Sequence, residues 1–517
     1  MSGSSFWDRR WAQPVVACLL FAVTAASRLP FVSHMLYAWD PANFALALRN
    51  YNVTFHQPHP PGYPLYVGTA SLVNLWVQDA NASYVYISIA TSAAAVAIVF
   101  LLASRMYDPW VGICSATVLG ATVGFWGYGE IAYPYTSLAF FGALVAWLCY
   151  LMWQGHNSLA VLCGLVLGIS GGVRQDTLLF LGPLWLVSVW RTGFWRLLLS
   201  GLVLCLTVLA WFIPAIQLSG GWDAYEKAST AQTGYIFSTY SVVTGALSAL
   251  RRNTETAILF LKQMFGLSLA VTVYFIGRFL TFKSLVADQR LAFLLLWFLP
   301  PAAVYLLLHI GDPGYILSLL PPLCIVTGVG IRDIGRDARS ALLLLSGRHP
   351  RLKGLASVAG SGGALLSALL LLGLVAWNVD AFTNTPGPVR LIEIRTIDNI
   401  LARQVEYARS FSTGDVVILA KERYRQFKYY LPDHNVQLLF DEYQPDYRQA
   451  RYSFQIPQGV STILVMDFGK TPPQFPGARG GDVRLASDPD VLLWRFDVKP
   501  GDTIQYGYDF FAMNGRS

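Results

Sequence analysis

Charged residues are scarce in this chain of 517 residues: Asp, Glu, Lys and Arg together make up 13%, whereas hydrophobic residues make up 54%. Soluble domains carry about 25% charged residues. The deficit lies before residue 380, where apolar runs recur that approach the roughly 20 residues needed to cross a bilayer. This composition excludes an ordinary soluble protein and indicates a polytopic α-helical membrane protein.

Cysteine is also rare, and all six cysteines lie inside apolar runs. We therefore expect small packing residues, with no disulfide bond and no thiolate metal site. A cleavable signal peptide is not evident, because the first apolar run leads into Arg28-Leu29-Pro30 without a small-residue cleavage site. The first run is therefore predicted to be a retained helix. The sequence also lacks internal repeats, low-complexity tracts and a P-loop motif.

The net charge of +7 comes from Lys and Arg residues that gather in short loops between apolar runs. This distribution is the topogenic pattern of a membrane protein, so no nucleic-acid partner is expected. The apolar runs predict about eleven spans, at 13–33, 84–104, 109–127, 133–153, 158–173, 176–191, 196–217, 256–281, 291–309, 313–331 and 356–378.

The basic residues also predict the orientation of these spans. With the N-terminus in the cytoplasm, the inside loops carry Arg105, Arg191, Arg196, Lys283, Arg290, Arg332, Arg336, Arg339, Arg348, Arg351 and Lys353. The outside loops keep Arg49, Arg174, Lys227, Arg251 and Arg252. This asymmetry favours the orientation, provided that the weakly apolar stretch 63–78 lies on the outer face or re-enters the membrane without crossing it.

Three segments outside the membrane follow from this topology: an external loop at about 34–83, a second at about 218–255, and a polar tail. In the tail, apolar runs predict strands at 416–419 and 462–466 and a helix at 392–410. We therefore predict a membrane domain over 1–383 and a soluble external α/β domain over 384–517. The Pro/Gly-rich linker 384–388 marks the boundary.

Asp40 is the first candidate for chemistry. It precedes Pro41, and this pair favours a helix start because Asp caps a helix and Pro fits its first position. One interpretation is therefore an N-cap for a short helix over 41–51. The alternative is a general base that the same turn holds at the membrane surface.

Glu130 lies between the third and fourth predicted spans, on the same expected face as Asp40. A carboxylate at the mouth of a helix bundle is costly unless it is solvated or paired. Glu130 is therefore either a solvated loop residue or a second acid that converges with Asp40 on one cavity.

Arg174 and Asp176 lie in a short external turn. Asp176 is typical of a helix cap. Arg174 either pairs with it, contacts lipid headgroups, or binds an anionic leaving group with its planar guanidinium. Arg28, near the end of the first span, has a similar choice and is expected to snorkel toward the interface.

His309, Asp312 and Tyr315 form a further polar group at the outer ends of two predicted spans, and His56 and His59 lie in the first external loop. Histidines and carboxylates on one face could bind a divalent metal. Their spacing matches no standard site, so metal binding is not favoured. The run HPPGYPLY at 59–66 is expected to form a stiff extended segment, because prolines restrict the backbone.

These motifs resemble the GT-C membrane glycosyltransferases, in particular the protein O-mannosyltransferase-like branch and its bacterial relatives. The resemblance rests on a first span, Asp40 before a short helix, HPPGYPLY at 59–66 and GEIAYPYTSL at 129–138. It covers the outline of residues 13–380, and HPPGYPLY is its more specific part.

The resemblance implies an inverting transferase that moves a sugar from a polyprenyl-phosphate donor to an acceptor hydroxyl. The reaction would take place at the outer face of the bacterial cytoplasmic (inner) membrane. Asp40 matches the catalytic acid of the first external loop, and Glu130 matches the second-loop acid. The candidates for binding donor phosphate or substrate are Arg174, His59, Tyr63, Arg28, Tyr133, His309, Asp312 and Tyr315. Many relatives carry paired acids in the first loop, whereas Pro41 follows Asp40 here, so a two-carboxylate metal site is not expected.

The expected partners are a polyprenyl-phosphate sugar, a glycan, lipid or protein acceptor, and membrane lipids, with no cofactor. Two rival functions stay open. A transporter would place polar residues near the bilayer midplane and use broken helices. An O-antigen ligase or wall-polymer polymerase would share the fold and the outer-face site but would use a polyprenyl diphosphate donor.

Overall fold

A computed structural model describes residues 7, 9, 11–281, 288–348, 355–439, 451–466, 479–484 and 492–507. Contacts divide the chain into two units. The first comprises Met1–Val32, Asn52–Thr54 and Pro60–Glu393, and the second comprises Ser33–Tyr51, Phe55–His59 and Ile394–Ser517. The division therefore falls ten residues beyond the predicted boundary at 383, and it groups most of the residues 33–59 with the tail.

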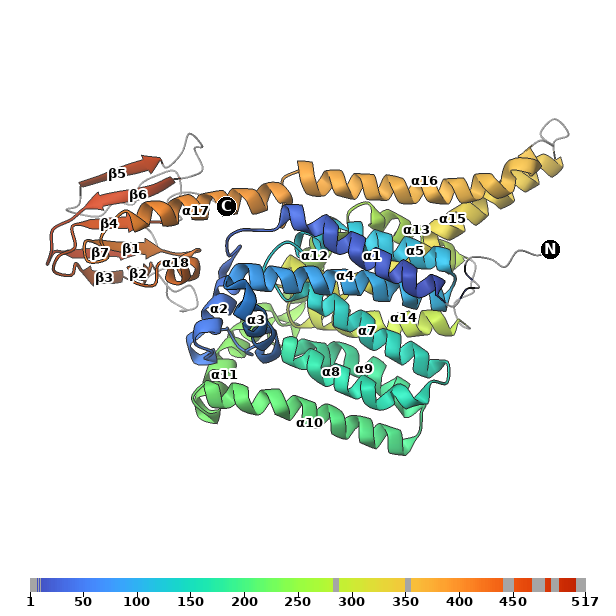
Figure 1. Ribbon diagram of the computed structural model, residues 1–517, viewed down its shortest axis with the longest axis horizontal. Helices are drawn as coiled ribbons and strands as arrows, with labels where there is room; N and C mark the ends of the chain where they lie inside the picture. The colour runs from blue at the N-terminus through green and yellow to red at the C-terminus, as the bar shows by residue number, and fades with distance from the viewer. Residues whose placement is uncertain are drawn as a thin grey trace. The chain divides into compact units, whose positions relative to one another are not determined.

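The first unit is helical, and its long helices lie roughly parallel to one another in Figure 1. Its first half contains α1 (Ala12–Arg28), η2 (Leu29–Phe31), α3 (Pro64–Val77), α4 (Ala80–Met106), α5 (Pro109–Ala121), α6 (Val123–Gly127), α7 (Tyr135–Trp153), η4 (Asn157–Leu159), α8 (Ala160–Val173) and α9 (Asp176–Trp190). Its second half contains α10 (Phe194–Leu218), α11 (Trp222–Tyr240), α12 (Val242–Phe265), α13 (Ser268–Thr281), α14 (Gln289–Leu307), η6 (Pro313–Ser318), α15 (Leu320–Arg348) and α16 (Leu355–Asn384).

Several of these helices can cross a membrane. Within the described residues, six are long and apolar enough, or seven if the bent pair α12 and α13 forms one span. Each of the eleven predicted apolar segments contains a helix, and three of these helices have only 10–17 residues, namely Pro109–Ala121, Asn157–Val173 and Asp176–Trp190. The chain is therefore a multi-pass helical protein, and the number of eleven crossings stays a prediction.

The structure differs from the predicted spans at 256–281. This stretch is broken between α12 and α13, which bend by 115°. Gly266 follows α12 with a positive φ of 57°, a conformation that glycine adopts without steric cost and that commonly ends helices. The predicted external loop 218–255 is largely helical, because it holds α11 and the first half of α12.

The stretch 63–78, predicted not to cross, forms the single helix α3 of 14 residues. At 1.5 Å per residue such a helix is about 21 Å long, shorter than the roughly 30 Å of a bilayer core. The run HPPGYPLY before it is not extended as predicted. Within this run, Gly62 and Tyr63 adopt positive φ values of 113° and 48°, and α3 begins with Pro64 at its first position.

Aspartate side chains cap the starts of α4 and α5. Asp79 precedes α4 and accepts a hydrogen bond from the backbone N–H of Ala82 at 2.7 Å. Asp108 precedes α5 and accepts from the N–H of Val111 at 3.0 Å. A capping carboxylate satisfies an N–H group that has no partner inside the helix.

The second unit carries the predicted α/β region. Besides α2 (Trp39–Arg49) it contains α17 (Leu391–Arg409, from Ile394 onward), α18 (Tyr424–Tyr430), β1 (Val416–Ala420), β2 (Asn435–Leu438), β3 (Arg451–Gln455), β4 (Thr462–Val465), β5 (Arg479–Arg484), β6 (Leu492–Asp497) and β7 (Thr503–Gly507). The short helix η3 (Val53–Phe55) lies where the chain passes between the units. The predicted helix at 392–410 and both predicted strands are present.

The strands of the second unit form two sheets in its described residues. The larger sheet has the order β2-β1-β4-β6-β5, with β1 parallel to β2 and β4 and the other pairs antiparallel, and β3 pairs with β7. Successive residues of β1 point to opposite faces. Val416 and Ile418 pack with Leu401 of α17 and Phe427 of α18, whereas Val417 and Leu419 pack with residues of β7.

The six cysteines are free thiols, and Cys114, Cys149, Cys163 and Cys324 are buried. Burial inside apolar helices fits the packing role expected for these four. Cys18 and Cys205 are exposed on the surface of α1 and α10.

Candidate functional site

Asp40 belongs to the second unit and lies in the first turn of α2. Ala38 occupies the N-cap position, so the predicted capping role of Asp40 is wrong. Its carboxylate instead faces His59, with 3.4 Å between Oδ1 and Nδ1. The Asp40 side chain is 36% exposed, whereas that of His59 is 15% exposed and its ring lies 5.6 Å from that of the buried Phe44. A partly solvated carboxylate beside an imidazole can accept a proton.

The segment around Asp40 is attached to the tail by polar contacts within the second unit. Asp398 of α17 accepts hydrogen bonds from the Ser33 hydroxyl at 2.8 Å and from the backbone N–H groups of His34 and Met35 at 2.9 and 3.0 Å. The N–H of Leu36 donates to the hydroxyl of Tyr430 at 2.9 Å. Residues 33–36 are therefore clamped four residues before Asp40.

Aromatic and cationic contacts hold α2 itself against α18. Trp39 packs on Tyr424, with 6.1 Å between the ring centroids. The Arg49 guanidinium lies 4.3 Å from the centroid of the Tyr429 ring. These contacts involve the first and last turns of α2, so α18 fixes the orientation of the helix that presents Asp40.

Arg174, in the first unit, is buried in the turn between α8 and α9. Its Nε donates to Asp176 Oδ2 at 2.8 Å, and its guanidinium lies 4.9 Å and 4.7 Å from the ring centroids of Tyr135 and Tyr315. Burial disfavours the charged form, but Asp176 and the surrounding tyrosines outweigh it, so the pKa of Arg174 is raised. Arg174 is therefore a permanent cation held in an aromatic cage.

The HPPGYPLY segment reaches the same cation. The Pro61 carbonyl accepts hydrogen bonds from the Gln175 amide at 3.0 Å and from the Tyr225 hydroxyl at 2.8 Å. Tyr63 is close enough to Arg174 to act on its charge. Gly172 has no room for a side chain, because an added Cβ would lie 2.5 Å from Leu65 Cγ. Close packing thus sets this segment against the Arg174 turn.

His309 and Asp312 flank the cage. The His309 ring lies 5.7 Å from that of Tyr315, and burial together with the charges of Arg174 and Arg252 lowers the pKa of His309 to about 4. His309 is therefore a neutral imidazole at pH 7. Asp312 caps η6 through the N–H of Gly314 at 2.7 Å and accepts from the Tyr128 hydroxyl at 2.5 Å.

Tyr128, Tyr133 and Tyr305 complete this aromatic group, and the ring centroids of Tyr128 and Tyr135 are 5.0 Å apart. Tyr133 stacks on Tyr135 at 5.1 Å, and Tyr305 stacks on Tyr315 at 5.4 Å. Sequence reasoning selected Tyr133 but not Tyr128, Tyr135 or Tyr305. The motif GEIAYPYTSL already contained Tyr135, two residues after Tyr133. Tyr305 lies inside an apolar run, where no sequence signal separates it from core residues.

Glu130 and Arg28 reach neither solvent nor the membrane interface. Both are fully buried, and their charges interact. Arg28 turns inward, donates to the Gly120 carbonyl at 2.6 Å and lies 4.5 Å from the centroid of the Trp126 ring. The predicted snorkelling of Arg28 is therefore wrong, as is the solvated-loop interpretation of Glu130. A buried charge pair avoids the cost that either charge would incur alone.

Metal ligands are sparse. In the described ranges, no group of three or more His, Cys, Asp and Glu side chains is arranged to hold a metal ion. The contact between Asp40 and His59 brings together only two side chains of this kind.

Comparisons with known proteins show what this chain is similar to. Residues 40–197 match the sequence model TMEM260_N, described as the protein O-mannosyl-transferase TMEM260 N-terminal domain. A comparison with curated proteins finds no match. Among solved structures, ArnT from Cupriavidus metallidurans bound to undecaprenyl phosphate is similar with a TM-score of 0.57 and 11% identity, covering 96% of this chain and 100% of that chain.

The apo state of ArnT from the same organism gives a TM-score of 0.51 at 11% identity, covering 88% of this chain and 92% of that chain. At this identity the likeness shows the fold alone. The chain is a multi-pass membrane protein with the fold of the GT-C glycosyltransferases, and its residues 40–197 are similar to the N-terminal domain of the protein O-mannosyl-transferase TMEM260.

Proposed function

We propose that this protein is an inverting glycosyltransferase that moves a sugar from a polyprenyl-phosphate donor to an acceptor hydroxyl. The observation that carries the proposal is Arg174, a buried cation caged by Tyr135 and Tyr315 in a turn between two apolar helices. The matched sequence model is named for an O-mannosyl-transferase and covers both Asp40 and Arg174. The structure of ArnT that shares the fold is described as bound to undecaprenyl phosphate.

Arg174 supplies what a lipid-phosphate leaving group needs. As the bond between the sugar and the phosphate breaks, negative charge develops on the phosphate oxygens. A preorganised guanidinium stabilises that charge and costs no reorganisation, and removal of one such donor typically costs about 10²–10³ in rate. Asp176 engages Nε of Arg174, and the terminal nitrogens of the fork are assigned to the phosphate.

Asp40 is assigned as the general base. It takes the proton of the acceptor hydroxyl as the hydroxyl oxygen bonds to the anomeric carbon. The bond from that carbon to the phosphate oxygen breaks in the same step, so the configuration at the anomeric carbon is inverted and the polyprenyl phosphate leaves as the anion. Its neighbour His59 is assigned to orient the Asp40 carboxylate, since Nδ1 lies 3.4 Å from Oδ1. The proposal requires no metal and no cofactor.

Tyr63, Tyr133, His309, Asp312 and Tyr315 are assigned to the substrate-binding surroundings of Arg174. Glu130, together with Arg28, is assigned to the support of the bundle, because its buried carboxylate is engaged by that arginine. The acceptor is a hydroxyl of a glycan, a lipid or a protein. The Lys and Arg distribution favours a site on the outer face of a bacterial cytoplasmic membrane, with the tail outside the cytoplasm.

The test is sugar transfer by the purified full-length protein from a panel of polyprenyl-phosphate sugars that begins with mannose. Asp40→Asn removes the base and keeps the size of the side chain. We expect the rate to fall about 10²–10⁴-fold, the usual contribution of a general base, while thermal stability is unchanged. A matched control is Asp79→Asn in the same loop, which retains a residue able to cap α4.

Activity of Asp40→Asn close to that of the parent would remove Asp40 from the mechanism. Transfer from polyprenyl diphosphate donors alone would assign the protein to the ligases. Binding or movement of a solute without any transfer would assign it to the transporters. Chelation of divalent ions is expected to leave the rate unchanged.

A further inference from the structure

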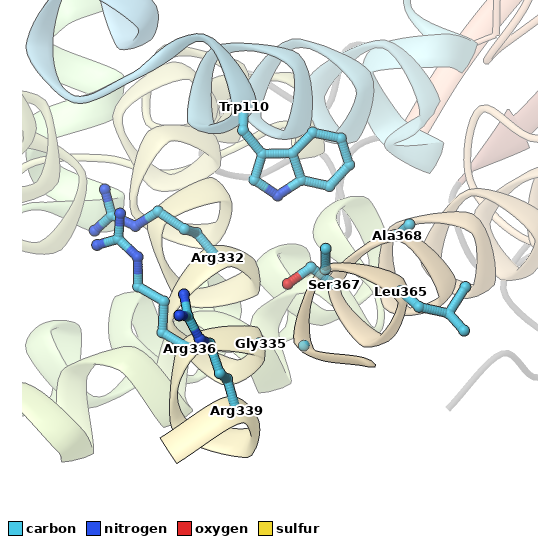
Figure 2. Close-up of a pocket in the computed structure, with 10 residues that line it drawn as sticks. Trp110, Arg332, Gly335, Arg336, Arg339, Leu365, Ser367 and Ala368 are labelled. Atoms are coloured by element: carbon cyan, nitrogen blue, oxygen red, sulfur yellow. The ribbon is translucent and has the colours of Figure 1, made fainter. Parts of the chain in front are cut away.

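A cavity of about 530 Å³ lies in the first unit between α5, α15 and α16. Its lining combines Trp110 with three arginines of α15, namely Arg332, Arg336 and Arg339, and with small and apolar residues of α16. In Figure 2 the guanidinium groups gather on one side, and Leu365, Ser367 and Ala368 lie on the other. The volume lies within the roughly 300–1,000 Å³ of small-molecule sites.

The cavity is distant from the Arg174 cage along the helices that form it. Trp110 lies in the first turn of α5, whereas Gly120, which accepts a hydrogen bond from Arg28, lies in its last turn. On α15, Arg336 lies about 24 Å from the start of the helix at Leu320, given a rise of 1.5 Å per residue. The three arginines lie in the part of α15 that the charge distribution predicts to face the cytoplasm.

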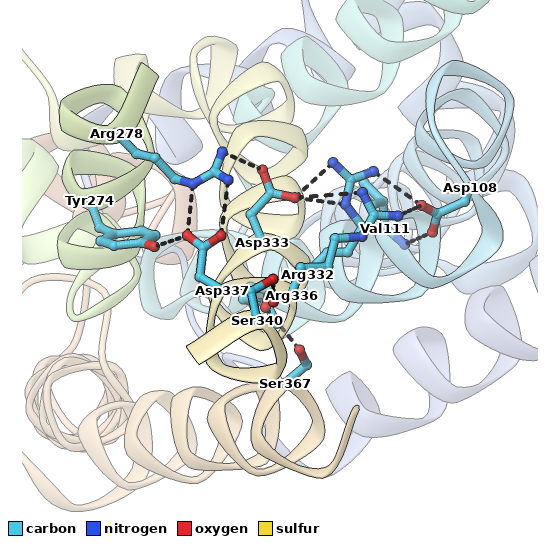
Figure 3. Close-up of polar contacts among 11 residues, drawn as sticks. Asp108, Val111, Tyr274, Arg278, Arg332, Asp333, Arg336, Asp337, Ser340 and Ser367 are labelled. Carbon is cyan, nitrogen blue, oxygen red and sulfur yellow. Dashed lines mark hydrogen bonds and ion pairs between the residues drawn. The ribbon is translucent and has the colours of Figure 1, made fainter. Parts of the chain in front are cut away.

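Ion pairs satisfy part of this positive charge. Arg278 contacts Asp337 at 2.8 Å and Asp333 at 3.3 Å, and Arg332 contacts Asp108 at 3.1 Å and Asp333 at 2.9 Å (Figure 3). All three carboxylates of this network are therefore engaged by Arg278 and Arg332.

Arg336 and Arg339 are paired with carboxylates only weakly or not at all within the described residues, so their guanidinium groups can bind an anion. Arg336 lies 3.9 Å from both Asp108 and Asp333, the outer limit of an ion pair, and its side chain is 63% exposed. Arg339 is exposed and makes no ion pair with any described residue. The open side of the cavity is therefore cationic.

The wall opposite the arginines is apolar and open to the surroundings of the bundle. Leu365, Leu369 and Leu372 of α16 are exposed and spaced by four and three residues, so they form one stripe that leads away from the cavity. Gly335 of α15 and Gly363 of α16, which both line the cavity, allow the two helices to approach closely. A Cβ added at either glycine would lie 2.5 Å from the backbone carbonyl oxygen of the other.

We propose that this cavity binds an anionic phospholipid, with the headgroup phosphate between Arg336 and Arg339 and an acyl chain along the leucine stripe. A guanidinium fork suits phosphate geometry, and tryptophan is enriched at the depth of lipid headgroups. The cytoplasmic leaflet is rich in anionic lipids and attracts basic residues near its surface. Basic residues that act only in topology need neither a cavity nor an adjoining apolar track. This site is independent of the proposed transferase activity.

The test is native mass spectrometry of the full-length protein, titrated with phosphatidylglycerol and, separately, with phosphatidylcholine. We expect one retained phosphatidylglycerol per protein and much weaker retention of phosphatidylcholine. Arg336→Gln combined with Arg339→Gln should weaken phosphatidylglycerol binding about tenfold or more. The matched control is Arg191→Gln combined with Arg196→Gln, which removes the same charge from another loop on the same predicted side.

A second variant separates a built site from surface charge. Ala364 of α16 is an exposed residue that also lines the cavity. Ala364→Phe fills the cavity and keeps every arginine, so it should abolish the retained lipid while leaving the fold intact. Equal retention of both lipids, equal loss in the control, or undiminished binding by Ala364→Phe would overturn the proposal. Displacement of phosphatidylglycerol by excess inorganic phosphate alone would assign the cavity to free phosphate and would also overturn it.

Discussion

The surroundings of Arg174 suit an arginine better than any other residue. Its guanidinium lies 4.9 Å and 4.7 Å from the ring centroids of Tyr135 and Tyr315 while Nε donates to Asp176, an arrangement that suits a cation with several fixed donors. A lysine ammonium can keep the charge but does not present the planar fork of donors that a guanidinium offers. The cage therefore serves the guanidinium shape as well as its charge.

Substitution of Arg174 is expected to act on the donor. Arg174→Lys should keep part of the activity, and Arg174→Ala should lose about 10²–10³ in transfer rate because one charge-stabilising donor is gone. The measurement is the transfer rate against polyprenyl-phosphate sugar concentration. Arg251→Ala is the control, since that arginine is exposed and pairs with Glu255 on the same helix. An Arg174→Ala protein that matches the parent at every donor concentration would reduce Arg174 to a structural contact.

The partner of a charged side chain could be predicted from the sequence only where the two residues lie close together in the chain. Arg174 and Asp176 lie two positions apart, and their predicted pairing is present. Arg28 ends α1 and Glu130 lies in the loop between α6 and α7, so their pairing depends on which elements become neighbours, and sequence periodicity does not encode this. The capping role expected of Asp40 failed because the helix begins two residues earlier than predicted, at Trp39.

At the scale of elements, α17 and α18 act as a support for α2. Asp398 is buried and receives three hydrogen bonds from residues 33–35, two of them from backbone N–H groups. Hydrogen bonds to a charged acceptor each contribute about 1.5–3 kcal/mol. We infer that Asp398 is a positioning residue for Asp40.

Asp398→Ala should therefore release residues 33–35 and lower the transfer rate through kcat, although Asp40 is unchanged. Hydrogen exchange of the His34 and Met35 amides should accelerate in parallel. Glu406→Ala is the control, since this acid lies on the same helix with a 78% exposed side chain. If exchange accelerates while the transfer rate is preserved, the clamp is not required to place Asp40.

The long apolar helices and the strands of the tail were predictable, because a membrane-spanning helix is apolar on all sides and a strand that is covered on both faces of its sheet is a continuous apolar run. The polar helix α11 was missed, since Trp222–Tyr240 shows no apolar periodicity. The break at Gly266 was missed because the flanking segments are both apolar. The attachment of residues 33–36 to the tail joins positions more than 360 residues apart, which no local pattern reveals.

The basic residues predict how the whole molecule is oriented across the membrane. A reporter that is active only in the cytoplasm should stay silent when fused after Ser517, because an odd number of crossings from a cytoplasmic N-terminus places the tail outside. The same reporter fused after Arg348, in a loop predicted to lie inside, should be active. A strong signal from the Ser517 fusion would mean an even number of crossings.

The buried pair of Arg28 and Glu130 also has a consequence for biosynthesis. Gly120, the hydrogen-bond acceptor of Arg28, is made 92 residues after it, and Glu130 follows shortly afterwards. At about 5–20 residues per second, α1 waits about 5–20 s with an uncompensated charge before its partner is translated. An unpaired arginine is costly in lipid, so the insertion machinery must shield α1 until α5 and α6 arrive. The order in which the helices leave the ribosome thus becomes part of how this bundle assembles.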